Sequence, residues 1–375
     1  MLEDNFLSLL DWCFNNSTEI VNTKDKSGNG KSLIHVASEL GLAPVVQNLI
    51  KRGVDLDCKD SKNLTSLHIS AKKGHFEVAE TLLENAAKVD CVDDSQMTPL
   101  LLASKNGHFE VVKTLMEKEA DLSLVGKNKL NSLHHACRND HLEVARILLK
   151  HEQNVNPLEK DQWTPLHFAC RNGHLEIAKL LLHSGAKINC QDETGATPLH
   201  VACRKGNLEI ARVLLENGAG IGIQDGEEST PLHIGALYGH FEIVNLLIKK
   251  QASMNLNDKN EKTPYMIAKE NRHKKIARLI YEKMIELASS KKFPKDNAKP
   301  TPEISIVTIN DEICTTMEIL AKNCVICHES IQEMFAFQPC GHAKTCKKCT
   351  MRIVATSQPC PMCRRNVTRY QKIFD

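Results

Sequence analysis

Apolar and polar positions recur with a fixed period along the first three quarters of the chain. A segment that resembles Thr-Pro-Leu-His begins at Ser32, Thr65, Thr98, Asn131, Thr164, Thr197, Thr230 and Thr263. Every interval between these starts is 33 residues, with no insertion. We number each repeat from the first residue of this segment, as position 1. Self-similarity at one fixed period predicts a stack of identical supersecondary units.

The pattern inside one repeat predicts a helix, a turn, a second helix and an extended loop. Thr or Ser at position 1 is suited to cap the first helix, and Pro at position 2 fits its first turn. Glycine at position 10, present in six of the eight repeats, turns the chain between the helices. Apolar pairs follow at a fixed offset, for example Leu82-Leu83, Leu148-Leu149, Leu181-Leu182 and Leu214-Leu215. These pairs are expected to face neighbouring repeats, so no repeat is stable alone.

The repeat pattern resembles the ankyrin repeat over residues 26–290. The resemblance implies a mainly α fold, an ankyrin-repeat solenoid of about eight units. Two repeats depart from the pattern, with Leu101 in place of His and Asp140 in place of Gly. Residues 1–25 are predicted to form an N-terminal helical cap, and the charged segment after Lys274 fits a C-terminal cap.

Histidine occupies position 4 in six repeats. Equivalent helices of neighbouring repeats lie about 8–10 Å apart, so these ring nitrogens cannot share one metal ion. We expect them instead to form hydrogen bonds that tie each repeat to the next. The six residues are His35, His68, His134, His167, His200 and His233.

The residue before position 1 belongs to the variable set that lines the concave surface of repeat proteins. In four consecutive repeats this residue is apolar, and the four are Leu64, Met97, Leu130 and Trp163. An exposed apolar stripe that contains Trp has the composition of a protein-binding hot spot, here for an unknown protein substrate. The alternative is that these side chains pack flat on neighbouring loops, and the sequence leaves both open.

Composition narrows the class of protein. The formal net charge is +2, which gives no reason to expect a nucleic-acid or membrane partner. No apolar run approaches ~18 residues, and the first residues lack the features of a signal peptide. We therefore expect no membrane partner and a location in the cytosol or the nucleus. Cysteine is then not expected to form disulfides, and Cys137, Cys170 and Cys203, at one equivalent position, are predicted packing residues.

Residues 291–320 are predicted to form a linker and a short helix. The first part is polar, contains proline and has no period, which is typical of a flexible spacer. From Asp311 a short helix is expected, with Ile313, Met317 and Leu320 on one face.

The terminal segment, residues 321–375, carries eight potential metal ligands. In chain order they are Cys324, Cys327, Cys340, His342, Cys346, Cys349, Cys360 and Cys363. Seven thiolates and one imidazole are enough for two tetrahedral Zn²⁺ sites with no open position for water, so the metal is structural. The spacing alone permits two sequential sites or two interleaved sites.

This segment resembles the RING finger, a small zinc-stabilised α+β domain. The resemblance implies interleaved sites, with one zinc on Cys324, Cys327, Cys346 and Cys349 and the other on Cys340, His342, Cys360 and Cys363. Residues 337–342 and the tail 367–374 are similar to the RING domains that end inhibitor-of-apoptosis proteins. In that subgroup the RING forms a homodimer, and an aromatic residue near the C terminus reaches the ubiquitin bound by the partner subunit. Phe374 matches that residue, although a tail residue that only packs is the alternative.

The RING resemblance also implies roles for four other residues. Ile326, Pro361 and Ile353 match contacts with the ubiquitin-conjugating enzyme. Arg364, directly after the last cysteine, matches the residue that hydrogen-bonds both the conjugating enzyme and ubiquitin.

These resemblances together imply a RING-type E3 ubiquitin ligase. The chain is expected to bind a conjugating enzyme charged with ubiquitin and to recruit substrate through its repeats, with no covalent intermediate on this chain. One alternative is a non-enzymatic ankyrin scaffold whose zinc domain only dimerises or docks. A second is nucleic-acid binding by the zinc domain. Residues 324–375 carry eight Lys/Arg against three Asp/Glu, but seven thiolates and two Zn²⁺ contribute −3 and leave only +2.

Overall fold

The computed structural model describes residues 22–25, 29–151, 154–290, 335–338 and 369–372. The chain divides into two compact units, Met1–Lys292 and Phe293–Asp375. The first unit contains the repeats and the second contains the zinc-ligand segment.

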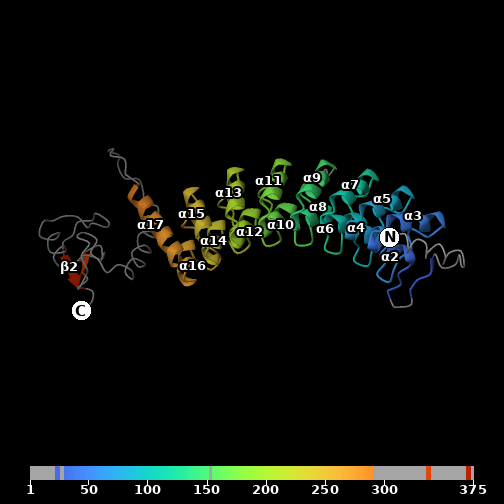
Figure 1. Ribbon diagram of the computed structural model, residues 1–375. Helices are drawn as coiled ribbons and strands as arrows, with labels where there is room; N and C mark the ends of the chain where they lie inside the picture. Colours follow the sequence, from blue (N-terminus) through green and yellow to red (C-terminus); the bar gives the residue numbers. More distant parts are fainter. Residues whose placement is uncertain (1–21, 26–28, 152–153, 291–334, 339–368, 373–375) are drawn as a thin grey trace. The chain divides into compact units, whose positions relative to one another are not determined.

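The described part of the first unit consists of paired helices in two layers (Figure 1). One layer holds the first helix of each repeat, which we call the inner helices, and each of them packs against the next. The second helices form the outer layer, and the neighbours in that layer also make contact. The inner helices are α2 (Leu33–Leu40), α4 (Ser66–Lys73), α6 (Pro99–Asn106), α8 (Ser132–Arg138), α10 (Pro165–Asn172), α12 (Pro198–Lys205), α14 (Pro231–Tyr238) and α16 (Pro264–Glu270). The outer helices are α3 (Ala43–Lys51), α5 (Phe76–Glu84), α7 (Phe109–Glu117), α9 (Leu142–His151), α11 (Leu175–His183), α13 (Leu208–Glu216), α15 (Phe241–Lys249) and the longer α17 (Lys274–Ser290).

The ends of the inner helices follow the predicted chemistry. Position 1 has extended backbone and caps the helix, as where the Thr65 hydroxyl accepts a hydrogen bond from the backbone N–H of His68. The six glycines at position 10 have left-handed backbone, with φ of 80° at Gly74. Asp140 (φ 62°) and Arg272 (φ 60°) adopt the same left-handed conformation without being glycine. The helix–turn–helix–loop repeat predicted from the sequence is therefore confirmed.

The core of the solenoid lies between the two helical layers. Each outer helix buries a leucine of its apolar pair or an equivalent residue, as with Leu82, Leu148, Leu181 and Leu214, which are fully buried. Cys137, Cys170 and Cys203 are also fully buried, and burial raises the pKa of each thiol. Their predicted role as small packing residues is confirmed.

Helix α17 closes the C-terminal end of the array. Its Ile276 and Ile280 are buried, and Tyr281 lies 6.2 Å, ring centre to ring centre, from Tyr265 of α16. At the opposite end, Lys24 forms an isolated bridge with Ser32, whereas the predicted N-terminal helix lies outside the described residues. None of the helices that the structure describes is long and apolar enough to cross a membrane.

The described part of the second unit is a pair of antiparallel strands, β1 (Phe335–Gln338) and β2 (Arg369–Lys372). The register pairs Phe335 with Lys372 and Gln338 with Arg369. The predicted linker and short helix at 291–320 lie outside the described residues.

Candidate binding surface and zinc-finger segment

The loop between repeats is held by a carboxylate at its turn. Oδ1 of Asp60 accepts hydrogen bonds from the backbone N–H groups of Lys62 (2.8 Å) and Leu64 (2.9 Å). Asn63, between them, has a φ of 58°, which this tight turn requires. The same bonding recurs at Asp93, Glu159, Asp192, Asp225 and Asp258. Gly126 occupies this place in the loop between the third and fourth repeats and offers no carboxylate.

The position 4 histidines connect each repeat to the next, as predicted. Nδ1 of each ring accepts a hydrogen bond from the backbone N–H at position 1 of its own repeat, at 3.1 to 3.3 Å. Nε2 reaches the backbone carbonyl that precedes position 1 of the following repeat, for example Ser229 O at 2.9 Å from His200. Burial lowers the pKa of all six rings, so they are neutral donors and acceptors near pH 7. In the third repeat Leu101 takes the place of the histidine, so this connection is absent there, and the leucine side chain is buried.

The four apolar residues predicted to form an exposed stripe do not form a continuous one. Leu130 is 7% exposed, whereas Leu64, Met97 and Trp163 are partly buried. The backbone carbonyls of Leu64, Met97 and Trp163 accept hydrogen bonds from position 4 histidines. At Leu130 the corresponding position 4 residue is Leu101, which cannot donate, and the Leu130 carbonyl accepts from the Gly126 N–H. Packing, the alternative left open by the sequence, applies at Leu130.

Trp163 is part of an aromatic cluster. Its ring centre lies 5.2 Å from that of Phe168 and 5.7 Å from that of His167. The guanidinium carbon of Arg171 lies 5.5 Å from the centre of the Trp163 ring, within cation–π range. Trp163 is therefore only partly buried, and its ring face packs against the Arg171 guanidinium.

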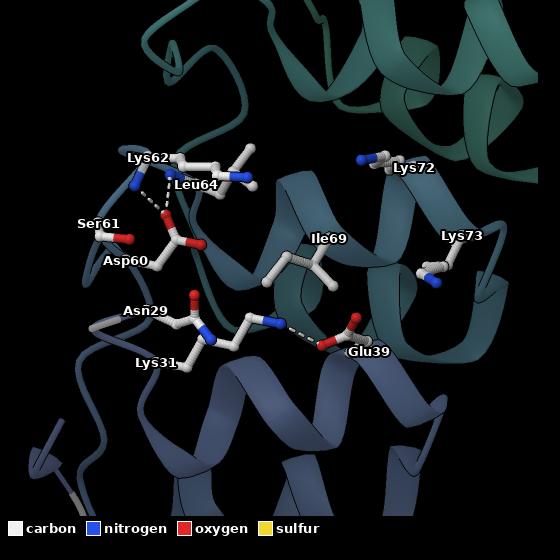
Figure 2. A pocket seen from close by; sticks show the side chains of 10 residues that line it. All are labelled: Asn29, Lys31, Glu39, Asp60, Ser61, Lys62, Leu64, Ile69, Lys72 and Lys73. Atoms are coloured by element: carbon white, nitrogen blue, oxygen red, sulfur yellow. Dashed lines mark hydrogen bonds and ion pairs between the residues drawn. The ribbon is translucent and has the colours of Figure 1, made fainter. Parts of the chain in front are cut away.

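Two separate hollows lie between the loops and the inner helices, one near each end of the array. We call the face of the array that carries positions 5, 8 and 9 of the inner helices the inner groove. In the first two repeats a hollow of about 220 Å³ is lined by Leu64 and by Ile69, Lys72 and Lys73 of α4, at positions 5, 8 and 9 (Figure 2). Equivalent positions of the seventh and eighth repeats line a second hollow, which also includes Arg204. Positions 5, 8 and 9 of the inner helices therefore line both hollows.

Position 8 carries a row of cations that the sequence analysis did not single out. From the second to the sixth repeat this position is Lys72, Lys105, Arg138, Arg171 and Arg204. The 33-residue period brings these five residues into register, but charged residues on a helix are usually solvated, so the sequence alone does not mark them as functional.

The zinc-ligand segment supplies donors that suit Zn²⁺. Its eight predicted ligands, together with Ile326, Ile353, Pro361, Arg364 and Phe374, lie outside the described residues. Seven cysteines and one histidine in the order three cysteines, one histidine and four cysteines suit two tetrahedral zinc sites. The part of the chain that the structure does describe holds no group of His, Cys, Asp or Glu that could bind a metal ion.

Comparison with known proteins identifies both parts of the chain. A solenoid of two-helix repeats joined by turned loops is the class of protein that the fold defines. The family of ankyrin repeats matches residues 33–126, 120–192, 158–225 and 199–291, and the chain belongs to this family. The family described as zinc finger, C3HC4 type (RING finger), matches residues 320–370, so the chain has a C-terminal RING domain after its ankyrin repeats. Both resemblances inferred from the sequence are confirmed.

Individual curated relatives match only a short part of the chain, whereas one solved structure matches more than half of it. The E3 ubiquitin-protein ligase APD2 of Arabidopsis thaliana is 40% identical over 52 residues, which are 14% of this chain and 12% of that protein. ORF106 of Ostreid herpesvirus 1, named as a candidate apoptosis inhibitor, is 44% identical over 55 residues, again 14% of this chain and 12% of that protein. The matches therefore span a small fraction of these relatives. The crystal structure of the human ASB11 ankyrin repeat domain is similar with a TM-score of 0.54 and 29% identity, covering 58% of this chain and 98% of that one.

Proposed function

We propose that this chain is a RING-type E3 ubiquitin ligase that holds its substrate with the ankyrin repeats. The observation that carries the proposal is the complete C3HC4 ligand set within the segment that matches the RING family. Two relatives, APD2 and APD4 of Arabidopsis thaliana, which match 52 and 66 residues of the chain, are named E3 ubiquitin-protein ligases.

The ligands would hold two Zn²⁺ ions in an interleaved arrangement. One site would use Cys324, Cys327, Cys346 and Cys349, and the other Cys340, His342, Cys360 and Cys363. The ions would supply folding energy, because a segment of this size has little core of its own. Along the sequence, strand β1 ends two residues before Cys340 and its partner β2 begins six residues after Cys363.

The RING would act by binding and orientation. Ile326, Ile353 and Pro361 would contact the conjugating enzyme, and the Arg364 guanidinium would donate hydrogen bonds to both the enzyme and ubiquitin. Holding the flexible ubiquitin thioester in one reactive orientation accelerates attack by a substrate lysine. Phe374 would contribute across a RING homodimer, to the ubiquitin bound by the partner subunit.

The repeats would raise the local concentration of substrate lysines. A partner bound on the inner groove is tethered to the same chain as the RING, so transfer behaves as an intramolecular step. Of the four residues predicted to bind substrate, Leu64, Met97 and Trp163 keep part of their surface available and Leu130 does not. We place this activity in the cytosol or the nucleus.

Discharge of ubiquitin from a charged conjugating enzyme tests the proposal. The full chain is compared with Arg364→Ala, Ile326→Ala and Phe374→Ala across a panel of conjugating enzymes. We expect the wild type to accelerate discharge over the rate without the chain, and each variant to accelerate it less than the wild type does. A wild type that is inactive with every conjugating enzyme would favour the scaffold, whose zinc domain only dimerises or docks.

A further inference from the structure

The five cations at position 8 form an unpaired row along the inner groove. Lys72, Lys105, Arg138 and Arg171 are exposed and Arg204 is half-buried. Within the described part of the chain, none of the five takes part in an ion pair. Among the side chains drawn in Figure 2, no hydrogen bond or ion pair joins Lys72 to another residue. Apart from two pairs at the ends of the array, the described ion pairs lie mostly on outer helices and at loop tips.

Beyond the row, position 8 is acidic in the first and eighth repeats and is Leu237 in the seventh. In the first repeat position 8 is Glu39, which pairs with Lys31 before position 1. In the eighth repeat the equivalent Glu270 pairs with Lys262 at 2.6 Å. The same two positions thus neutralise each other at the ends of the array. From the second to the seventh repeat the residue before position 1 is apolar or small, so it offers the position 8 cations no ion-pair partner. Lys72 does feel the charge of Glu39 in the first repeat, because it adds to the effect of the Lys31 hydrogen bond in lowering the pKa of that carboxyl.

Aromatic rings support the two central arginines. The guanidinium carbon of Arg138 lies 5.9 Å from the centre of the Phe168 ring, and that of Arg171 lies 5.5 Å from the centre of the Trp163 ring. A guanidinium stacked on a ring loses fewer orientations when it binds a carboxylate, and its donors remain available at its edge. The groove therefore combines charge with an apolar base at its centre.

His135 adds an unused polar atom beside the row. It occupies position 5, which faces the groove, in a place where the neighbouring repeats have Leu102 and Phe168. It is 6% exposed, and its Nε2 has no hydrogen-bond partner among the described residues. Burial, followed by the charges of Lys105, His134 and Arg138, lowers the pKa of His135 to about 4. A buried imidazole nitrogen without a hydrogen-bond partner lowers the stability of the fold unless a bound ligand supplies that partner.

We propose that the inner groove of repeats two to six binds an extended acidic polypeptide segment, with a carboxylate at about every third residue. Neighbouring inner helices lie about 8–10 Å apart. An extended chain advances about 3.3 Å per residue, so three residues span one repeat. The proposal rests on the proposed function, since it names the substrate class that the repeats would present to the RING.

The spacing favours a polypeptide over nucleic acid. A nucleic-acid strand carries a phosphate at every ~3.4 Å of helix axis, about three times denser than this row of cations. Carboxylates also border the groove, because Asp225, Glu227 and Asp258 line the second hollow together with Arg204. A polyphosphate backbone would meet repulsion there, whereas a peptide can place a neutral residue at that point.

Peptide binding to the full chain tests the proposal without any conjugating enzyme. The probe is a fluorescein-labelled peptide of about 15 residues with Glu at every third position, Ser and Gly between them and one central Leu. The groove variant combines Lys105→Glu, Arg138→Glu and Arg171→Glu. The control variant combines Lys113→Glu, Lys150→Glu and Lys249→Glu, which are exposed on outer helices α7, α9 and α15 and change the net charge equally. A milder pair, Lys105→Gln with Arg171→Gln, covers the case in which charge reversal prevents folding.

Fluorescence anisotropy should show binding to the wild type that weakens as salt is added. We expect at least about tenfold weaker binding by the groove variant, an intermediate loss with the milder pair and less than about a twofold change with the control. Absence of binding to the wild type, or equal loss in the control, would overturn the proposal. So would tighter binding of a peptide with Lys in place of Glu, or of a single-stranded RNA of equal length. Discharge of ubiquitin is measured separately, so failure of the groove and failure of the ligase activity are distinguishable.

Discussion

The histidine connection between repeats leads to a quantitative prediction for His200→Leu. Leu is the residue that the third repeat carries at this position, as Leu101, and its volume is close to that of His. The substitution removes the hydrogen bonds of Nδ1 with Thr197 N (3.2 Å) and Thr197 Oγ1 (2.9 Å) and the bond from Nε2 to Ser229 O (2.9 Å), while it creates little cavity.

The loss in stability differs between the partners of Nδ1 and the partner of Nε2. The Thr197 amide is left without that partner in a buried place, which costs about 1–3 kcal/mol. Ser229 O still accepts from Asp225 N at 3.0 Å, so the loss there is about 1 kcal/mol. We therefore expect the free energy of unfolding of the repeats to fall by about 2–4 kcal/mol.

Urea unfolding of the full chain, followed by far-UV circular dichroism, measures this change. The matched control is Leu101→Met, at the same position of the third repeat, where no side-chain hydrogen bond exists to lose and the volume is conserved. The control should cost less than about 1.5 kcal/mol. A loss below about 0.5 kcal/mol for His200→Leu would refute the view that these hydrogen bonds tie the repeats together.

Three further predictions concern protonation, backbone and metal. Since burial lowers the pKa of His134 and His135 to about 4, the unfolded state binds more protons below pH 6.5. Stability should therefore fall between pH 6.5 and 4, by up to about 1.4 kcal/mol per pH unit for each histidine, and His135→Leu should flatten the curve of unfolding free energy against pH. Gly206→Ala should cost at least about 1 kcal/mol in urea unfolding, because φ is 79° there and a new Cβ would lie 2.7 Å from the His240 ring; an unchanged midpoint would contradict this. A strong zinc chelator should abolish ubiquitin discharge while the helical dichroism of the repeats persists, and parallel loss of both signals would contradict the assignment of the metal to the RING alone.

The repeated local chemistry of the array was predictable from the sequence. Caps at Thr65 and its equivalents, left-handed glycines such as Gly74 and the histidine bonds depend on residues within one repeat and its neighbour, so the 33-residue period defines them. Burial of Leu130 was not predictable, because it depends on how the side chains of adjacent loops fill space. The loop before it departs from the pattern at Gly126, whose N–H donates to the Leu130 carbonyl.

The cations at position 8 were visible in the alignment but had no evident meaning without the structure. A row of lysines and arginines on helices usually faces water and has no further role. Three structural features distinguish this row from an ordinary charged surface. They are the groove, the ion pairs of Glu39 and Glu270 at the ends of the array, and the ring contacts of Arg138 and Arg171.

The rate of ubiquitin discharge with Arg364→Ala and with Arg365→Ala tests the central claim most directly. The two arginines are adjacent, equal in charge and both follow Cys363, but only Arg364 is proposed to connect the conjugating enzyme to ubiquitin. The account predicts that the wild type and Arg365→Ala accelerate discharge to free lysine similarly and that Arg364→Ala slows it by about tenfold or more, the effect of losing about 1.4 kcal/mol in the transition state. Equal rates for the two variants, with both zinc ions retained, would contradict it.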